Sequence, residues 1–113
     1  GVGVNGHLGL NEPDDVFTLE THYVKLAPTS MEHQMLTSVS ASAEYGMTSG
    51  IGEIMAARRI LFLVSGIKKQ QAFASFMEQK VSPAFPASVL WLHHDITCIC
   101  DQEAAELWLR TKG

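Results

Sequence analysis

Short apolar runs alternate with segments of helical spacing along most of the chain. Ile60–Val64 and Ile96–Cys100 are continuous and strand-sized, which is typical of parallel strands buried on both faces. Alternation predicts a third strand over Thr21–Leu26, whereas Tyr45–Ser49 is short and ambiguous. Helical segments are predicted over Ser30–Leu36, Glu53–Arg59, Lys68–Gln79, Ser88–His93 and Gln102–Leu109, the last of them capped by Asp101.

This order of strands and helices predicts an α/β fold with a mainly parallel sheet. In such sheets, ligands bind at the loops that leave the carboxyl ends of the strands. Gly1–Pro13 and Ser65–Lys69 are loops of this kind, so site residues are expected there. The 113 residues show neither repeats nor a linker, and the whole chain fits within one domain.

Composition narrows the classes of function. Eight Lys and Arg against twelve Asp and Glu leave a net charge of −4, so no basic surface for a nucleic-acid backbone is expected. No apolar run reaches the roughly 18 residues that a membrane span requires. The first residues lack the pattern of a signal peptide, and Cys98 and Cys100 form no disulfide framework. We therefore expect a cytoplasmic protein that binds neither nucleic acid nor a membrane.

The chain opens on a glycine-rich segment. Gly1, Gly3 and Gly6 spell the G-x-G-x-x-G of dinucleotide sites, but that motif requires a helix to begin within the glycines. Gly9 and Pro13 disfavour such a helix, so we reject the dinucleotide interpretation. Turns of this kind normally follow a buried strand, and we expect the sequence to lack an N-terminal part.

The same segment carries residues suited to acid–base chemistry. His7 can exchange protons near neutral pH, and a nearby carboxylate such as Glu12 can orient its ring. Asn5 lies two residues before the histidine, and Gly3 and Gly6 let the backbone approach a small ligand closely. The residues alone leave a second interpretation open: a histidine that caps an ordinary turn, beside a solvated carboxylate.

The run Gly1–Pro13, with its His-x-x-x-Asn-Glu-Pro ending, resembles the signature loop of the glucosamine-6-phosphate deaminase/isomerase family. Further resembling segments are Met47–Gly52, Leu63–Lys69, Pro86–His93 and Asp101, so the resemblance covers nearly the whole chain. Within the family, Asn5 and the Leu8–Leu10 run are more similar to the galactosamine-6-phosphate isomerase branch.

The resemblance implies a Rossmann-like, three-layer α/β/α fold, with residues 1–113 as the C-terminal half of one domain. It implies conversion of glucosamine 6-phosphate or galactosamine 6-phosphate to the ketose 6-phosphate, with release of ammonia and without a cofactor or metal. It assigns sugar-ring opening to His7 with Glu12 as supporting carboxylate, and phosphate binding to Lys69, whose alternative is a solvated surface lysine. The partners implied are a sugar phosphate and the missing N-terminal half.

The chain departs from the family pattern in three places. Asn5 stands where the usual motif has an aspartate, and an amide can position the histidine but cannot stabilise an imidazolium by charge. The glucosamine enzymes carry a phosphate-binding arginine near the position of Gln34, where this chain has His33-Gln34. The aspartate that moves the proton between C2 and C1, and the phosphate loop before it, match no residue here. The sequence thus predicts half of an active site.

Two other functions remain open at this stage. A 6-phosphogluconolactonase shares the fold and a similar glycine–histidine loop, but it lacks the Asn11-Glu12-Pro13 ending. A non-catalytic sugar-phosphate sensor resembles the fold but loses the catalytic histidine and glutamate. That ending therefore speaks against the lactonase, and retention of His7 and Glu12 favours the enzyme over the sensor, while the missing base and Asn5 leave the sensor open.

Other reactive residues are assigned structural roles. Cys98 and Cys100 are predicted to be small core residues. His93-His94-Asp95 is predicted to be a capping or surface stretch, because consecutive helical residues diverge too far to hold one metal. Four aromatic residues are predicted to lie in the core or in a subunit contact of a homo-oligomer: Phe73, Phe76, Trp91 and Trp108.

Overall fold

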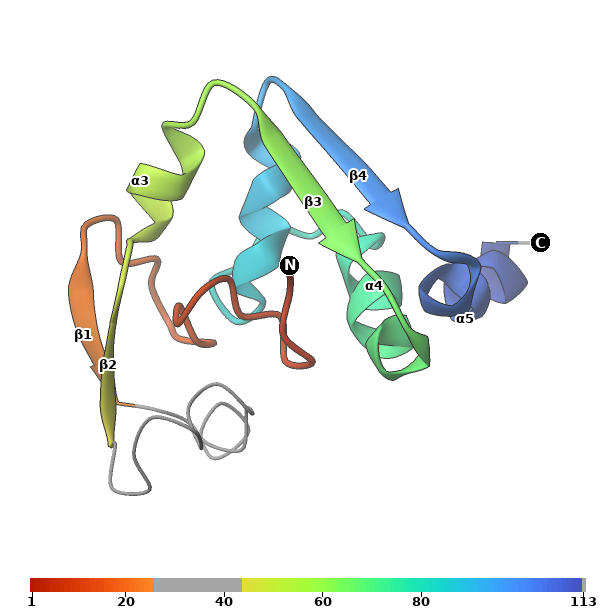
Figure 1. Ribbon diagram of the computed structural model, residues 1–113, viewed down its shortest axis with the longest axis horizontal. Coiled ribbons are helices and arrows are strands. Elements are labelled where there is room, and N and C mark those ends of the chain that lie inside the picture. Colours follow the sequence, from red (N-terminus) through yellow and green to blue (C-terminus); the bar gives the residue numbers. More distant parts are fainter. Residues whose placement is uncertain (26–43, 113) are drawn as a thin grey trace.

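The computed structural model describes residues 1–25 and 44–112 (Figure 1). The helix predicted over Ser30–Leu36, and with it His33 and Gln34, lies outside the described residues. The elements in chain order are β1 (His22–Lys25), β2 (Tyr45–Thr48), α3 (Ile51–Met55), β3 (Ile60–Val64), the 3₁₀ helix η1 (Ile67–Lys69), α4 (Gln70–Phe76), the 3₁₀ helix η2 (Pro86–Leu92), β4 (Ile96–Cys100) and α5 (Gln102–Lys112).

The described strands form two separate pairs. β3 and β4 run parallel, with Phe62 opposite Cys98, which confirms the parallel pairing expected for the two apolar runs. β1 and β2 form an antiparallel pair of their own, so the ambiguous segment at Tyr45 is a strand of this second pair. The carboxyl end of β3 lies beside the N-terminal glycine segment, where the sequence predicts site residues (Figure 1).

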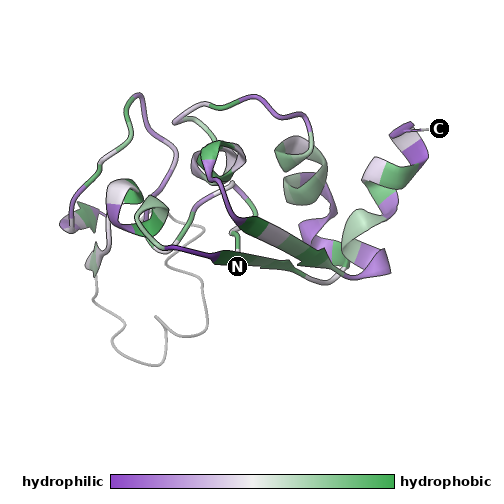
Figure 2. Ribbon diagram, turned by 90° about the horizontal axis from the view of Figure 1, so that it is seen from above, coloured by the Kyte–Doolittle hydropathy of each residue, from purple (hydrophilic) through white to green (hydrophobic). Residues whose placement is uncertain are grey.

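The core lies on one face of the β3–β4 pair. α4, η2 and α5 all lie on that side, as Figure 2 shows from above. The rings of Phe62 and Phe76 lie 4.7 Å apart, and Phe76 stacks on Trp91 at 5.1 Å. Phe73 meets Trp108 edge-on at 5.8 Å. The predicted aromatic core is confirmed, and aromatic contacts of this kind stabilise it beyond their buried area.

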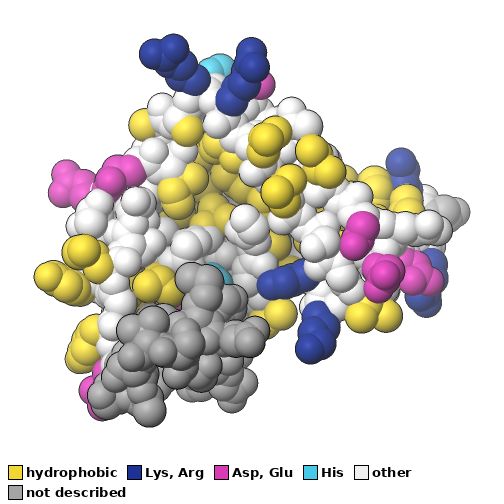
Figure 3. All heavy atoms as spheres, in the orientation of Figure 1, with side chains coloured by type: hydrophobic (Ala, Val, Ile, Leu, Met, Phe, Trp, Pro, Cys, Tyr) yellow, Lys and Arg dark blue, Asp and Glu magenta, His cyan; other side chains and the backbone are white. Residues whose placement is uncertain are grey.

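The other face of the same pair is open, so the prediction that both runs are buried on two sides is wrong for this chain. Leu61 and Leu63 of β3 are 65% and 53% exposed, and Ile99 of β4 is 54% exposed. Figure 3 shows hydrophobic side chains gathered over β3 and β4 on this face. Cys98 lies opposite Phe62 and so faces the helix side, but it is exposed there and is not a core residue, whereas Cys100 is half-buried.

The observed helix boundaries differ from the predicted ones where local contacts compete with the 3.6-residue period of apolar side chains. α3 begins two residues earlier than predicted, because the Glu53 carboxylate accepts a hydrogen bond from the Gly50 N–H, which is the half of a capping box that a glycine N-cap allows. It ends at Met55, and Arg59 pairs with Asp95 instead of continuing the helix. Asp101 caps α5 as predicted, since its Oδ1 accepts from the Ala104 N–H at 2.8 Å.

His93 is not at the surface. It is only 8% exposed, and both ring nitrogens are bonded: Nε2 donates to the Ala57 carbonyl at 2.6 Å and Nδ1 accepts from the Asp95 N–H at 3.0 Å. These bonds agree with the capping role expected for His93, whereas the expected surface position is wrong for this residue. His94 stacks on it and stays exposed.

Across the described ranges 1–25 and 44–112, the helices are too short and too polar to cross a lipid bilayer.

Candidate active site

The glycine-rich segment folds into consecutive turns. The Gly3 N–H donates to the His7 carbonyl and the Gly6 N–H donates to the Gly3 carbonyl, each at 2.9 Å. These turns replace the helix that a dinucleotide-binding motif needs. Gly6 is buried, and its carbonyl accepts from the Ala87 N–H at the start of η2. The segment is thus anchored to the core beneath η2.

The imidazole of His7 is held in one orientation. Its Nδ1 lies 2.7 Å from the Gly9 carbonyl, and a carbonyl only accepts, so Nδ1 carries the hydrogen. In the neutral ring Nε2 then holds the lone pair that a general base needs. A Cβ on Gly3 would collide with the His7 ring, so this glycine is required by the close approach of the ring to the backbone.

Asn5 connects His7 with Glu12. Its Nδ2 donates to the Glu12 carboxylate at 2.9 Å, and its Oδ1 accepts from the His7 backbone N–H at 3.2 Å. An amide is suited to both contacts because it donates and accepts at once, whereas an aspartate here would bring a second negative charge beside Glu12. The departure from the family motif therefore leaves the loop held together.

Asn11 is a residue whose part in the site the sequence analysis missed. It is 5% exposed, and its Nδ2 donates to the carbonyls of Leu8 and Ser49, both at 2.9 Å. The glycine segment is thereby fastened to the residue that follows β2. The Asn-Glu-Pro spelling was the available signal, and its Asn is structural because it satisfies two carbonyls at a chain crossing.

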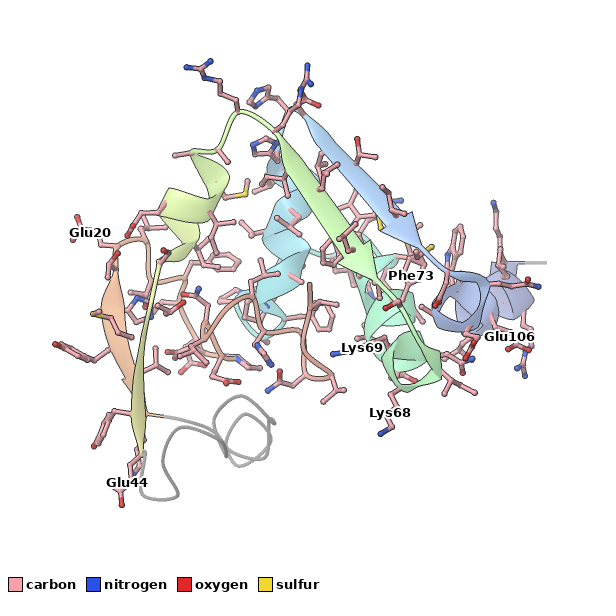
Figure 4. The ribbon with its side chains drawn as sticks, in the orientation of Figure 1. Glu20, Glu44, Lys68, Lys69, Phe73 and Glu106 are labelled. Carbon is pink, nitrogen blue, oxygen red and sulfur yellow. The ribbon has the colours of Figure 1, made fainter. Side chains whose placement is uncertain are left out.

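Lys69 reaches the glycine segment from the other side. Its ammonium donates to the Val2 carbonyl at 2.6 Å in a partly buried contact. Figure 4 shows Lys69 pointing from η1 toward the N-terminal segment, while Lys68 points away from it. The predicted lysine is thus held in place rather than free in solvent.

One cavity brings these groups together. It has a volume of about 530 Å³ and is lined by Gly1, Val2, Gly3, His7, Gly9, Leu63, Val64, Ser65 and Lys69. An imidazole and an ammonium therefore face one space at the carboxyl end of β3, where α/β sheets bind ligands. Glu12 lines a second cavity of about 370 Å³ beside β1, together with Asn11.

The electrostatics of the described residues favour an anion over a metal at the first cavity. Lys69 brings a positive charge, and no carboxylate lines that space. No three His, Cys, Asp or Glu side chains in residues 1–25 and 44–112 lie close enough together to hold a metal ion. Partial burial, and then the neighbouring Cys100, raises the pKa of the Cys98 thiol, which disfavours the thiolate form that a nucleophile needs.

Known proteins that resemble this chain belong to one family. No family model matches the chain. It is 42% identical over 99 residues to the Escherichia coli protein named "Putative deaminase AgaI", a match that covers 88% of this chain and 39% of that protein. It is 38% identical to a glucosamine-6-phosphate deaminase of Thermoanaerobacter sp. and 39% identical to glucosamine-6-phosphate deaminase 1 of Bacillus subtilis. Each of these two matches covers 95% of this chain, and 43% and 45% of the relatives, respectively.

A solved structure, described as a monomeric glucosamine-6-phosphate deaminase of the NagB superfamily, matches with a TM-score of 0.85 and 39% identity. The match covers 94% of this chain and 45% of that one. The chain spans less than half the length of the relatives that it matches. The Rossmann-like α/β class is confirmed, and the chain is a homologue of the glucosamine-6-phosphate deaminase family over nearly all of its own length.

Proposed function

We propose that this chain forms part of an amino-sugar-phosphate deaminase/isomerase, which converts glucosamine 6-phosphate or galactosamine 6-phosphate to the ketose 6-phosphate and ammonia. The observation that carries the proposal is the cavity of about 530 Å³ with the His7 imidazole and the Lys69 ammonium on its walls. That volume falls in the range of sites for small ligands. The named relatives support the same reaction class.

In this proposal His7 exchanges the protons that ring opening requires. The Gly9 carbonyl holds Nδ1–H, so Nε2 can take the proton of the anomeric hydroxyl and return one to the ring oxygen. Asn5 maintains the loop geometry by bonding the His7 backbone and the Glu12 carboxylate. Lys69 holds the phosphate through a charge-assisted hydrogen bond.

Among residues 1–25 and 44–112, no carboxylate lines the cavity that could serve as the base that moves the proton from C2 to C1. We propose that this base and the remaining phosphate contacts belong to the complementary N-terminal half of the domain, which would be this chain's partner in a cytoplasmic enzyme. The 113-residue chain alone is then expected to release negligible ammonia from either sugar phosphate. Robust ammonia release by the pure chain would contradict this division of the site.

The activity itself is tested in a chimera in which this chain replaces the matching segment of the Bacillus subtilis deaminase. Ammonia release by the chimera is expected, and His7→Gln should lower kcat by about 10²–10⁴-fold, the usual contribution of general acid–base catalysis. Glu12→Gln should lower it less. His94→Gln is the matched control, since His94 is exposed and remote from the cavity. A folded chimera that binds the sugar phosphate without turnover would favour the non-catalytic sensor.

The phosphate contact is tested by a pair of neighbouring lysines. Lys69→Ala should raise the Kd for the sugar phosphate by about 10- to 150-fold, which corresponds to the loss of about 1.5–3 kcal/mol for a hydrogen bond to a charged group. Lys68→Ala should leave the Kd unchanged, because Lys68 is exposed and points away from the cavity. Equal affinities of the two variants would return Lys69 to the role of a surface lysine.

A further inference from the structure

Asp101 makes more contacts than a helix cap needs. Besides the Ala104 N–H of α5, its carboxylate accepts from the Gly66 N–H with both oxygens, at 3.1 Å and 3.0 Å. Its own N–H donates to the Val64 carbonyl at 3.3 Å. One residue at the end of β4 therefore holds the end of β3 and the turn that follows it.

The turn that Asp101 holds leads to the proposed phosphate lysine. Gly66 has φ +93° and immediately precedes η1, the short helix that ends at Lys69. A Cβ on Gly66 would meet nothing within 4 Å, so glycine is needed there for its backbone conformation and not for space. The Asp101 side chain does not line the cavity, so its carboxylate acts on the site through the turn that it holds.

We infer that Asp101 is a positioning residue: its carboxylate fixes the Gly66–Lys69 turn, so that the Lys69 ammonium is held at the Val2 carbonyl in the cavity wall. The inference rests on the proposed function for the role of Lys69 toward phosphate. The negative charge of Asp101 is compatible with a nearby anion because backbone N–H groups of Gly66 and Ala104 point at it. Because the Gly66 N–H already donates to Asp101, it is not available to bind a phosphate. The Lys69 ammonium is then the group of this turn that can contact the anion.

Two substitutions separate positioning from capping. Serine is as good an N-cap as aspartate, so Asp101→Ser keeps the start of α5, but its side chain is too short to reach Gly66 as well. Asp101→Asn keeps an oxygen that can accept from both Ala104 and Gly66. A residue that only caps α5 would tolerate both changes, whereas a positioning residue tolerates only the second.

The readout is the accessibility of Lys69 relative to its neighbour Lys68. Limited acetylation of the intact 113-residue chain, read by mass spectrometry, gives the ratio of the two rates in the same molecule. We expect Asp101→Ser to raise the Lys69-to-Lys68 ratio by about two- to tenfold, as the loss of one hydrogen bond permits. Asp101→Asn should stay at the native ratio. An unchanged ratio in Asp101→Ser, with α5 intact by circular dichroism, overturns the inference.

A further variant and a phosphate-binding assay complete the test. Gly66→Ala strains the turn from its other end and leaves the α5 cap in place, so it should raise the ratio even where Asp101→Ser fails to fold; a native ratio in Gly66→Ala would also contradict the inference. Titration with inorganic phosphate then measures the consequence for binding. A raised ratio with unaltered phosphate affinity keeps the positioning role and contradicts the phosphate role of Lys69, so the two proposals fail separately.

Discussion

The two faces of the β3–β4 pair show how differently one apolar run can be used. On the covered face, Phe62 and Val64 are each 2% exposed beneath α4 and η2. On the open face, Leu61 and Leu63 of the same strand are more than half exposed. The run Ile60–Val64 is uniformly hydrophobic, so composition does not distinguish the faces, and only the position of the helices does (Figure 2).

The difference teaches that a continuous apolar run does not by itself reveal which face of its strand is covered. Parallel sheets are normally covered on both faces, and a solved relative of more than twice this length has the same architecture. Within the described residues, β3 pairs with a strand on one edge only, the edge toward β4. In a parallel ladder alternate residues face opposite edges, and the Val64 carbonyl bonds toward β4. Leu63 therefore faces the other edge, where Gly1 lies near its carbonyl.

The largest expected effect separates the two faces by stability. Phe76→Ala removes a ring that packs between Phe62 and Trp91, and it should lower the free energy of unfolding by about 3–5 kcal/mol. Leu61→Ala on the open face should change it by no more than about 0.5 kcal/mol. Urea denaturation of both variants measures the contrast, and similar losses would show that the open face is packed in solution.

A second contrast concerns adjacent histidines. His93→Ala should cost about 1–3 kcal/mol, because it leaves the Ala57 carbonyl and the Asp95 N–H without their buried partner. His94→Ala serves as the control, since that side chain is exposed. The melting temperatures of the two variants test this prediction. A larger decrease for His94→Ala would mean that the exposed His94 ring, and not the buried His93 ring, supplies most of the stabilisation.

The open face should bind an apolar dye. Leu61, Leu63 and Ile99 form one patch, and exposed patches of this kind bind anilinonaphthalene sulfonate. Replacing Leu61 and Ile99 with lysine should remove about half or more of the dye fluorescence, without a loss of stability. Leu109→Lys on α5 is the matched control, because Leu109 is 49% exposed outside the patch. Dye binding that survives the double substitution would place the patch elsewhere.

The smallest effect is a pH dependence at an exposed contact. The Thr21 hydroxyl, bonded to the Glu53 carboxylate, holds the pKa of that carboxyl below its ordinary value of 4.5. A lowered folded pKa means stabilisation that is present above pH 4.5 and is lost as pH falls through the folded pKa. Melting temperatures of the native chain and Glu53→Gln should therefore differ at pH 7 and converge in acid. Thr21→Val should weaken that convergence, and parallel pH curves would contradict it.

Much of the local structure was predictable from the sequence, since neighbouring residues determine it. The runs Ile60–Val64 and Ile96–Cys100 became strands with the predicted bounds, and Asp101 caps α5 as its position before the helix indicated. The boundaries of α3 moved because the Glu53–Gly50 contact and the turn toward β3 outweighed periodicity. Local rules tell which backbone groups need a hydrogen-bond partner, but not which of several possible partners each group binds.

The candidate site divides in the same way. The residue types in Gly1–Pro13 indicated acid–base chemistry, and the resemblance selected His7, Glu12 and Lys69. Their arrangement depended on contacts that no spacing shows: the Gly9 carbonyl on His7, the Asn5 amide on Glu12, and the Val2 carbonyl on Lys69 from 67 residues away in sequence. By itself, the sequence determined the two apolar strands and the Asp101 cap, because these depend on near neighbours. Only the tertiary structure decided which face of β3 is covered and which groups share a cavity, because burial and contact across the chain depend on where the backbone returns.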